Sequence, residues 1–142
     1  MIETKQIIMM TKCAVDTNIL VYLYDASDDR KRQISESLLI TSPVVSSQVI
    51  SEFLNTAKRT LKLPKNEILT KAIQLFNKCE IIPINQTTLE KALVLIQRYD
   101  FQLFDSLIVA SALQAGCTFL YSEDLQHNQF IDNRLRIINP FL

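Results

Sequence analysis

The sequence has few of the residues on which many enzyme classes depend: its 142 residues include one glycine, one histidine and no tryptophan. With Gly116 alone there is no glycine-rich loop, which excludes P-loop and dinucleotide-binding enzymes. His127 has no serine or cysteine motif near it, so a hydrolytic triad is poorly supported. Repeats and Gly/Ser linkers are also missing, and we therefore expect a single domain.

Charge of either sign is not in excess, because 15 Lys and Arg residues balance 15 Asp and Glu residues. A nucleic-acid partner would have to be held by a local basic patch, and not by the net charge of the protein. Two short basic groups, at 30–32 and 58–62, are candidates for following a phosphate backbone. Solvated helix faces explain them equally well, and the sequence does not decide between the two.

Long hydrophobic runs and paired cysteines are absent too. No run reaches the length of a membrane span, and the apolar stretch at 7–10 is too short for a signal peptide. Cys13, Cys79 and Cys117 are far apart and lack metal-ligand spacing, which is typical of core residues in a reducing compartment. We therefore expect a cytoplasmic protein with no membrane partner.

What the sequence does contain is an alternation of strand-like and helical segments, which follows an N-terminal extension at 1–11 and fills a domain at 12–142. Such alternation indicates βαβ units. The predicted fold class is α/β, a three-layer sandwich with a mainly parallel central sheet of about five strands and helices on both faces. The predicted strands are 12–16, 43–46, 81–84, 118–121 and 136–138. The predicted helices are 19–24, 28–39, 47–57, 64–78, 87–99 and 103–115.

Local signals set several boundaries. Ser47 is expected to cap the helix after the second strand, and Thr87 to open a capping box with Glu90. Pro83 indicates that the third strand lies at an edge of the sheet. Gly116 is expected to end the last helix at its C′ position.

Four acidic residues lie where this fold would bring side chains together. Asp16 ends the first strand, Asp124 follows the fourth, and Glu52 and Asp105 lie near the starts of two helices. In open α/β sheets the active crevice lies at the carboxyl ends of the strands. We therefore expect these carboxylates to converge, although ordinary surface acids and helix caps would be the simpler explanation for any one of them.

Converging carboxylates without histidine or cysteine suit a hard divalent cation, Mg²⁺ or Mn²⁺. Asp105 shares a helix face with Ile108 and Ala112, which is expected to point into the core, so its charge needs a partner. Such a cation activates water and stabilises a phosphoryl transition state.

Neighbouring polar residues have less specific interpretations. Thr17 and Asn18 are expected to cap the first short helix and to orient Asp16. Ser122 either hydrogen-bonds Asp16 or a metal-bound water, or simply starts a turn. Glu123 is interpreted as a solvated neighbour of the acidic group.

With these residues placed, the chain resembles PIN domains of the VapC toxin type. The resemblance covers nearly everything after residue 11, and the order of the motifs makes it specific. The matching segments are V-D-T-N-I-L-V-Y at 15–22, S-S-Q-V-I-S-E-F at 46–53, F-D-S-L-I-V-A-S-A-L at 104–113, Y-S-E-D-L-Q-H at 121–127 and R-I-I-N-P-F at 136–141.

The resemblance implies a metal-dependent endoribonuclease, the toxin of a toxin–antitoxin pair, which hydrolyses RNA phosphodiester bonds. Asp16, Glu52, Asp105 and Asp124 match the acidic quartet of the family. Asp16, Asp105 and Asp124 would bind Mg²⁺ or Mn²⁺, and Glu52 would orient or deprotonate the attacking water. The implied partners are an RNA substrate, a cognate antitoxin and a second copy of the chain, the last also suggested by the apolar helical segments at 69–76 and 89–96.

Three positions depart from the family pattern: Asn128 after the histidine, and Asp100 and Gln102 before the last helix. They lie outside the quartet, so they affect the expected substrate more than the chemistry. Two alternatives remain. One is an aspartate-nucleophile phosphatase, which would need a second Asp where Asn18 stands. The other is a PIN-like RNA- or partner-binding module without turnover.

Overall fold

The computed structural model describes residues 11–142. The predicted N-terminal extension lies outside the described residues, apart from Thr11. Strands are β1 (Cys13–Val15), β2 (Val44–Ser46), β3 (Glu80–Ile82), β4 (Phe119–Tyr121), β5 (Phe130–Ile131) and β6 (Leu135–Ile138). Helices are α2 (Thr17–Val21), the 3₁₀ turn η1 (Tyr22–Tyr24), α3 (Asp29–Leu39), α4 (Ser47–Thr60), α5 (Lys65–Phe76), α6 (Gln86–Tyr99) and α7 (Leu103–Gln114).

The six strands form one sheet in the order β3-β2-β1-β4-β6-β5. The first five in this order run parallel to one another, which confirms the predicted fold class, and β5 alone is antiparallel. β1 has parallel neighbours on both edges and helices over both faces, so all three of its residues are buried and apolar. The proline prediction also holds, because β3, which ends just before Pro83, is an edge strand.

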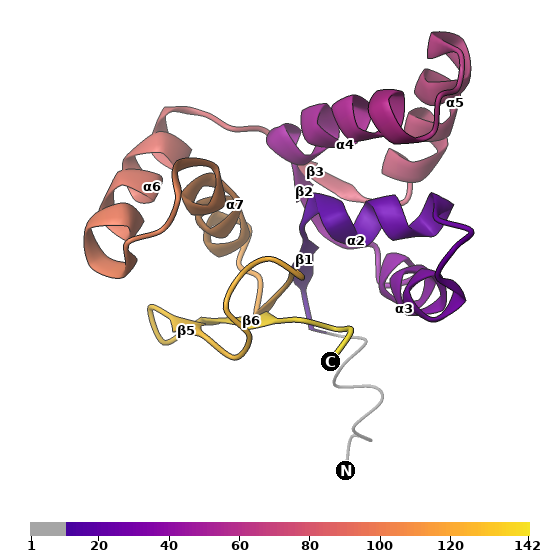
Figure 1. Ribbon diagram of the computed structural model, residues 1–142. Helices are drawn as coiled ribbons and strands as arrows, with labels where there is room; N and C mark the ends of the chain where they lie inside the picture. The colour runs from indigo at the N-terminus through magenta and orange to yellow at the C-terminus, as the bar shows by residue number, and fades with distance from the viewer. Residues whose placement is uncertain (1–10) are drawn as a thin grey trace.

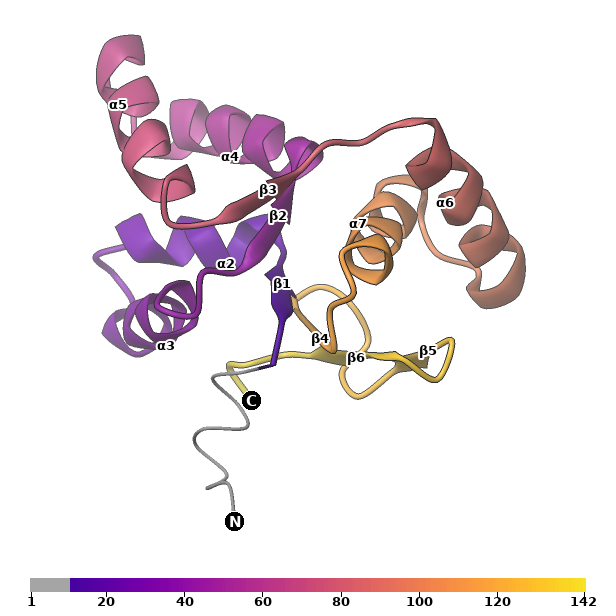
Figure 2. The same ribbon diagram turned by 180° about the vertical axis from the view of Figure 1, so that it is seen from behind.

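Helices cover both faces of the sheet (Figures 1 and 2). Helices α2 to α5 lie on one face, and their core includes the buried side chains of Val15, Phe53 and Phe76. Helices α6 and α7 lie on the other face, over a core that includes Leu95 and Leu120. The three predicted layers are therefore present.

Strand β5 was not predicted, because it has only two residues and pairs through a tight hairpin. Asp132 and Asn133 both adopt positive φ in the hairpin turn, at 51° and 54°. Asn and Asp tolerate this conformation better than other non-glycine residues, so the Asp-Asn pair was the available signal.

Two predicted helix caps are wrong, one by a single residue and the other by two. The side chain that caps α4 is that of Ser46, and Ser47 instead accepts a hydrogen bond from the Ile84 amide at 3.1 Å. The capping box of α6 is formed by Asn85 and Thr88, not by Thr87. In both places two candidate caps stand close together, and tertiary contacts decide between them.

The end of α7 is as predicted. Gly116 lies at the C′ position with φ +74°, and the amide of Cys117 reaches back to the Ala112 carbonyl at 3.0 Å. After its exposed first turn, α7 is mostly buried from Ser106 to Leu113 between the sheet and α6, which explains the apolar sequence of this part. Within residues 11–142, no helix is long and apolar enough to cross a bilayer.

Candidate active site

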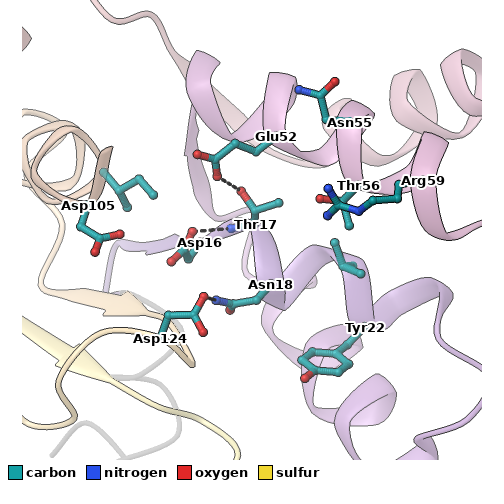
Figure 3. A pocket seen from close by; sticks show the side chains of 12 residues that line it. Asp16, Thr17, Asn18, Tyr22, Glu52, Asn55, Thr56, Arg59, Asp105 and Asp124 are labelled. Atoms are coloured by element: carbon teal, nitrogen blue, oxygen red, sulfur yellow. Dashed lines mark hydrogen bonds between the residues drawn. The ribbon is translucent and has the colours of Figure 1, made fainter. Parts of the chain in front are cut away.

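A pocket of about 500 Å³ opens where the carboxyl ends of β1 and β4 meet α4 and α7 (Figure 3). All four predicted carboxylates line it, and each comes from a separate segment of the chain. Its lining residues are Asp16, Thr17, Asn18, Val21, Tyr22, Glu52, Asn55, Thr56, Arg59, Asp105, Ile108 and Asp124.

Asp16 is the most buried member, with 5% of its surface exposed. It is the N-cap of α2, where one carboxylate oxygen accepts from the Thr17 amide at 2.7 Å and the other from the Ser122 hydroxyl at 2.8 Å. Burial raises the pKa of Asp16 to about 6; the two hydrogen bonds oppose this rise, and the charges of Glu52 and Asp124 add to it. The protein thus holds a carboxylate where its charged form is disfavoured.

Glu52 is fixed through both of its carboxylate oxygens. One accepts from the Thr17 hydroxyl at 2.7 Å and the other from the Gln48 amide group at 2.8 Å. Gln48 lies one helical turn before Glu52 on α4 and also donates to the Phe104 carbonyl at 3.4 Å, which links α4 to α7. Glu52 is therefore held in one orientation from two sides.

Asp105 lies in the first turn of α7 and is partly buried. Burial raises its pKa, and the charges of Asp124 and Glu52 add to the shift. Among residues 11–142, no side chain or amide donates a hydrogen bond to its carboxylate. The charge expected to need a partner therefore has only the start of the helix to compensate it.

Asp124 is held by Asn18, which donates to it at 3.0 Å and accepts from the amide of Glu123 at 3.3 Å. Glu123 does not line the pocket and forms an ion pair with Lys31 at 2.9 Å. It is therefore a neighbour of the acidic group, as predicted, but it is neutralised by Lys31 and not simply solvated.

The roles of three neighbouring residues differ from expectation or refine it. Thr17 and Asn18 do not cap the first helix, since Asp16 does so itself. The amide of Thr17 does orient Asp16, as predicted, and the side chains of Thr17 and Asn18 hold Glu52 and Asp124. The predicted hydrogen bond from Ser122 to Asp16 is present. Gln48 was missed, although its position four residues before Glu52 was a usable signal.

The oxygen-only donor set fits a hard divalent cation such as Mg²⁺. Asp16 and Asp105 have pKa values raised by burial, and both interact unfavourably with the charges of Glu52 and Asp124, so the pocket holds negative charge that a cation would offset. Within residues 11–142, no three Asp, Glu, His or Cys side chains are already drawn together as a closed metal cluster. The carboxylates surround an open pocket, and their metal-binding role stays a prediction.

Solved structures provide matches to the fold. A toxin–antitoxin complex from Klebsiella pneumoniae is 22% identical over 92% of this chain and 98% of that chain, with a TM-score of 0.68. VapC20 of Mycobacterium tuberculosis, a toxin that cleaves the sarcin–ricin loop, is 20% identical over 80% of this chain and 92% of that chain, with a TM-score of 0.63. VapBC2 of Rickettsia felis, bound to a promoter DNA fragment, is 18% identical over 89% of this chain and 97% of that chain, with a TM-score of 0.63.

No curated protein matches the sequence. The family model described as PIN domain matches residues 13–131, which extend from the first residue of β1 to the end of β5 and include all four pocket carboxylates. On this match, the chain belongs to the PIN domain family.

Proposed function

We propose that this protein is a metal-dependent endoribonuclease that hydrolyses RNA phosphodiester bonds and serves as the toxin of a toxin–antitoxin pair. The observation that carries the proposal is the convergence of four carboxylates, from four segments, on one open pocket. Membership of the PIN domain family and the fold shared with toxins of this kind support it.

In this proposal Asp16, Asp105 and Asp124 would hold Mg²⁺ or Mn²⁺, which would polarise a water molecule and offset the charge of the phosphoryl transition state. Glu52 orients the attacking water and accepts its proton. Each oxygen of Glu52 already accepts one hydrogen bond, from Thr17 or Gln48, so the carboxylate is fixed and still has free lone pairs. Attack by the water oxygen then forms a new bond to phosphorus and breaks the bond to the leaving oxygen of the RNA strand, which takes up a proton to become a hydroxyl.

The two alternatives fit the pocket less well. An aspartate-nucleophile phosphatase needs a second acid at position 18, and Asn18 is already engaged in orienting Asp124. A binding module without turnover has no use for four carboxylates that repel phosphate. The acidic end of the pocket therefore favours the hydrolytic proposal.

Incubation of the purified protein with labelled RNA tests the proposal. We expect no cleavage in EDTA, cleavage when Mn²⁺ or Mg²⁺ is added, and none by Asp105→Asn under either condition. Asp105→Asn is suited to this test because no described hydrogen bond depends on the carboxylate, so the fold should be retained. Cleavage in EDTA, or full activity of a folded Asp105→Asn protein, would contradict the proposal.

The proposed protein partners are a cognate antitoxin and a second copy of the chain. Exposed apolar residues recur at four-residue spacing on two helices, Leu69 and Ile73 on α5 and Leu89 and Leu93 on α6. Light scattering at micromolar concentration tests the homodimer, which a monomeric mass would contradict.

A further inference from the structure

The pocket has two chemically different ends. Its acidic end is formed by the four carboxylates, and its other end, along α4, is formed by Asn55, Thr56 and Arg59 (Figure 3). Arg59 is the only positively charged residue among the described residues that line the pocket. A single guanidinium thus faces the same space as four carboxylates.

The α4 residues lie on one helix face. Glu52, Asn55, Thr56 and Arg59 follow the spacing i, i+3, i+4 and i+7, which aligns side chains along one side of a helix. At a rise of about 1.5 Å per residue, Arg59 lies about 10 Å along the helix from Glu52. This face therefore leads from the proposed water-activating carboxylate to a cation, with short polar side chains between them.

The guanidinium of Arg59 is available to bind a ligand. Its side chain is exposed, and within residues 11–142 it has no hydrogen bond or ion pair. By contrast, Arg32 is paired with Asp29 and Arg98 with Asp132. Arg59 faces the pocket without closing onto any of its carboxylates, which leaves its donors free for a ligand.

A strand of RNA would need a free guanidinium here, because the acidic end of the pocket repels every phosphate that the metal ion does not neutralise. Arginine presents a planar set of donors that matches a phosphate in two-point contacts. We propose that Arg59 binds a phosphate of the RNA strand adjacent to the scissile one, and that the strand lies along Asn55 and Thr56. This subsite rests on the proposed nuclease function and adds a position at which the substrate is held.

Lys58 provides a matched control. It precedes Arg59 in the last turn of α4, so both residues interact with the same helix end and carry the same charge. Lys58 does not line the acidic pocket and instead borders a separate apolar groove with Leu63 and Ile68. If the two basic residues serve only the helix terminus, Lys58→Met and Arg59→Met will behave alike.

Steady-state cleavage of a labelled RNA oligonucleotide with Mn²⁺ is the first test. Arg59→Met should raise KM about tenfold and leave kcat nearly unchanged, because a charge-assisted contact to a non-reacting phosphate is lost. It should also reduce the slope of log KM against log salt by about 0.7, the value for one phosphate contact on a single strand. Arg59→Lys should retain the slope, and Lys58→Met should match the wild type in both measurements.

Replacing single phosphates by uncharged methylphosphonates gives the second test. In the wild type, one non-scissile position should raise KM when neutralised, and in Arg59→Met the same replacement should have no further effect. Equal behaviour of Arg59→Met and Lys58→Met, or retained sensitivity at that position in Arg59→Met, would overturn the subsite while leaving the nuclease intact. A wild-type protein that cleaves no RNA with Mn²⁺ would overturn the proposed function and the subsite with it.

Discussion

Asp16 and Asp132 are both held by several neighbours, yet their environments are opposite. Asp132, in the β5–β6 hairpin, accepts hydrogen bonds from Lys91, Arg98 and Tyr99, all on α6. Lys91 is the main cause of its lowered pKa, and Tyr99 and Arg98 add to the effect. Asp16 has two neutral donors and no cation, and burial raises its pKa to about 6.

The carboxylate of Asp132 stabilises the fold, whereas that of Asp16 has no cationic partner and is available to bind a ligand. The two cations on Asp132 tie the hairpin to α6 and leave little charge to bind anything else. At Asp16 the protein forgoes such compensation, which lowers its stability unless a cation is bound from solution. Exchange of Asp for Asn at each position tests this distinction.

The largest expected difference is in activity. Asp16→Asn should reduce RNA cleavage at least about a thousandfold, because the amide keeps the shape but loses the charge that would hold the cation. Asp132→Asn should cleave RNA within about twofold of the wild type, because neither Asp132 nor its partners on α6 line the pocket. Initial rates with labelled RNA and Mn²⁺ measure both, and full activity of a folded Asp16→Asn protein would contradict the assignment.

The next effect is on stability without metal, and it depends on pH. Between the ordinary pKa of 3.8 and the folded value of about 6, folded Asp16 holds a proton that the unfolded chain has released. The stability that this proton contributes is present below pH 4 and is lost as pH rises through 6. In EDTA, Asp16→Asn should therefore match the wild type near pH 4 and exceed it by about 3 kcal/mol above pH 7.

Urea unfolding of both proteins in EDTA across this pH range measures the difference. A mutant that is less stable than the wild type at pH 7 would show that the charge of Asp16 is compensated in the folded protein. For Asp132 the pH dependence of folding stability is the opposite. Its lowered pKa gives stability that is present above pH 4 and lost as pH falls further.

The pocket side of this contrast could be predicted from sequence because it depends on local patterns, whereas the environment of Asp132 was not predicted. An apolar run that stops at Asp16, and acids near helix starts at Glu52 and Asp105, were enough to place the pocket once parallel strands were assumed. The layers and the mainly parallel sheet followed from the alternation of elements in the same way, whereas the order of the strands was not predicted beyond the edge position of the third. The extra strand β5 did not, since two residues in a hairpin give no periodicity.

Partners far apart in the sequence could not be predicted. Lys31 and Glu123 are 92 residues apart, and Asn18 and Asp124 are 106 apart, so no spacing rule connects them. The basic group at 58–62 remained ambiguous for a related reason, because only the packing of α4 shows that Arg59 and not Lys58 lines the pocket.

Added metal should produce the next effect. A divalent ion at a hundredfold excess over its dissociation constant, bound only by the folded state, adds about 2.7 kcal/mol. Mn²⁺ should therefore raise the melting temperature of the wild type and of Asp132→Asn by similar amounts. It should do much less for Asp16→Asn. An equal response of all three proteins would show that Asp16 lies outside any metal site.

The smallest expected effect is the loss of folding stability in Asp132→Asn. This loss should not depend on metal. The ammonium of Lys91 and the exposed guanidinium of Arg98 lose their carboxylate, while the hydrogen bonds with Tyr99 can persist with the amide. Because the two cations keep 30% and 53% of their side chains exposed to solvent, the loss should be about 1 kcal/mol. Thermal melts should show the same loss in EDTA and in Mn²⁺, and a smaller loss in high salt, which screens the pairs. If the loss of stability changes with Mn²⁺, the metal acts on the hairpin as well as on the pocket. That result would contradict the assignment of a structural role to Asp132 and a metal-binding role to Asp16.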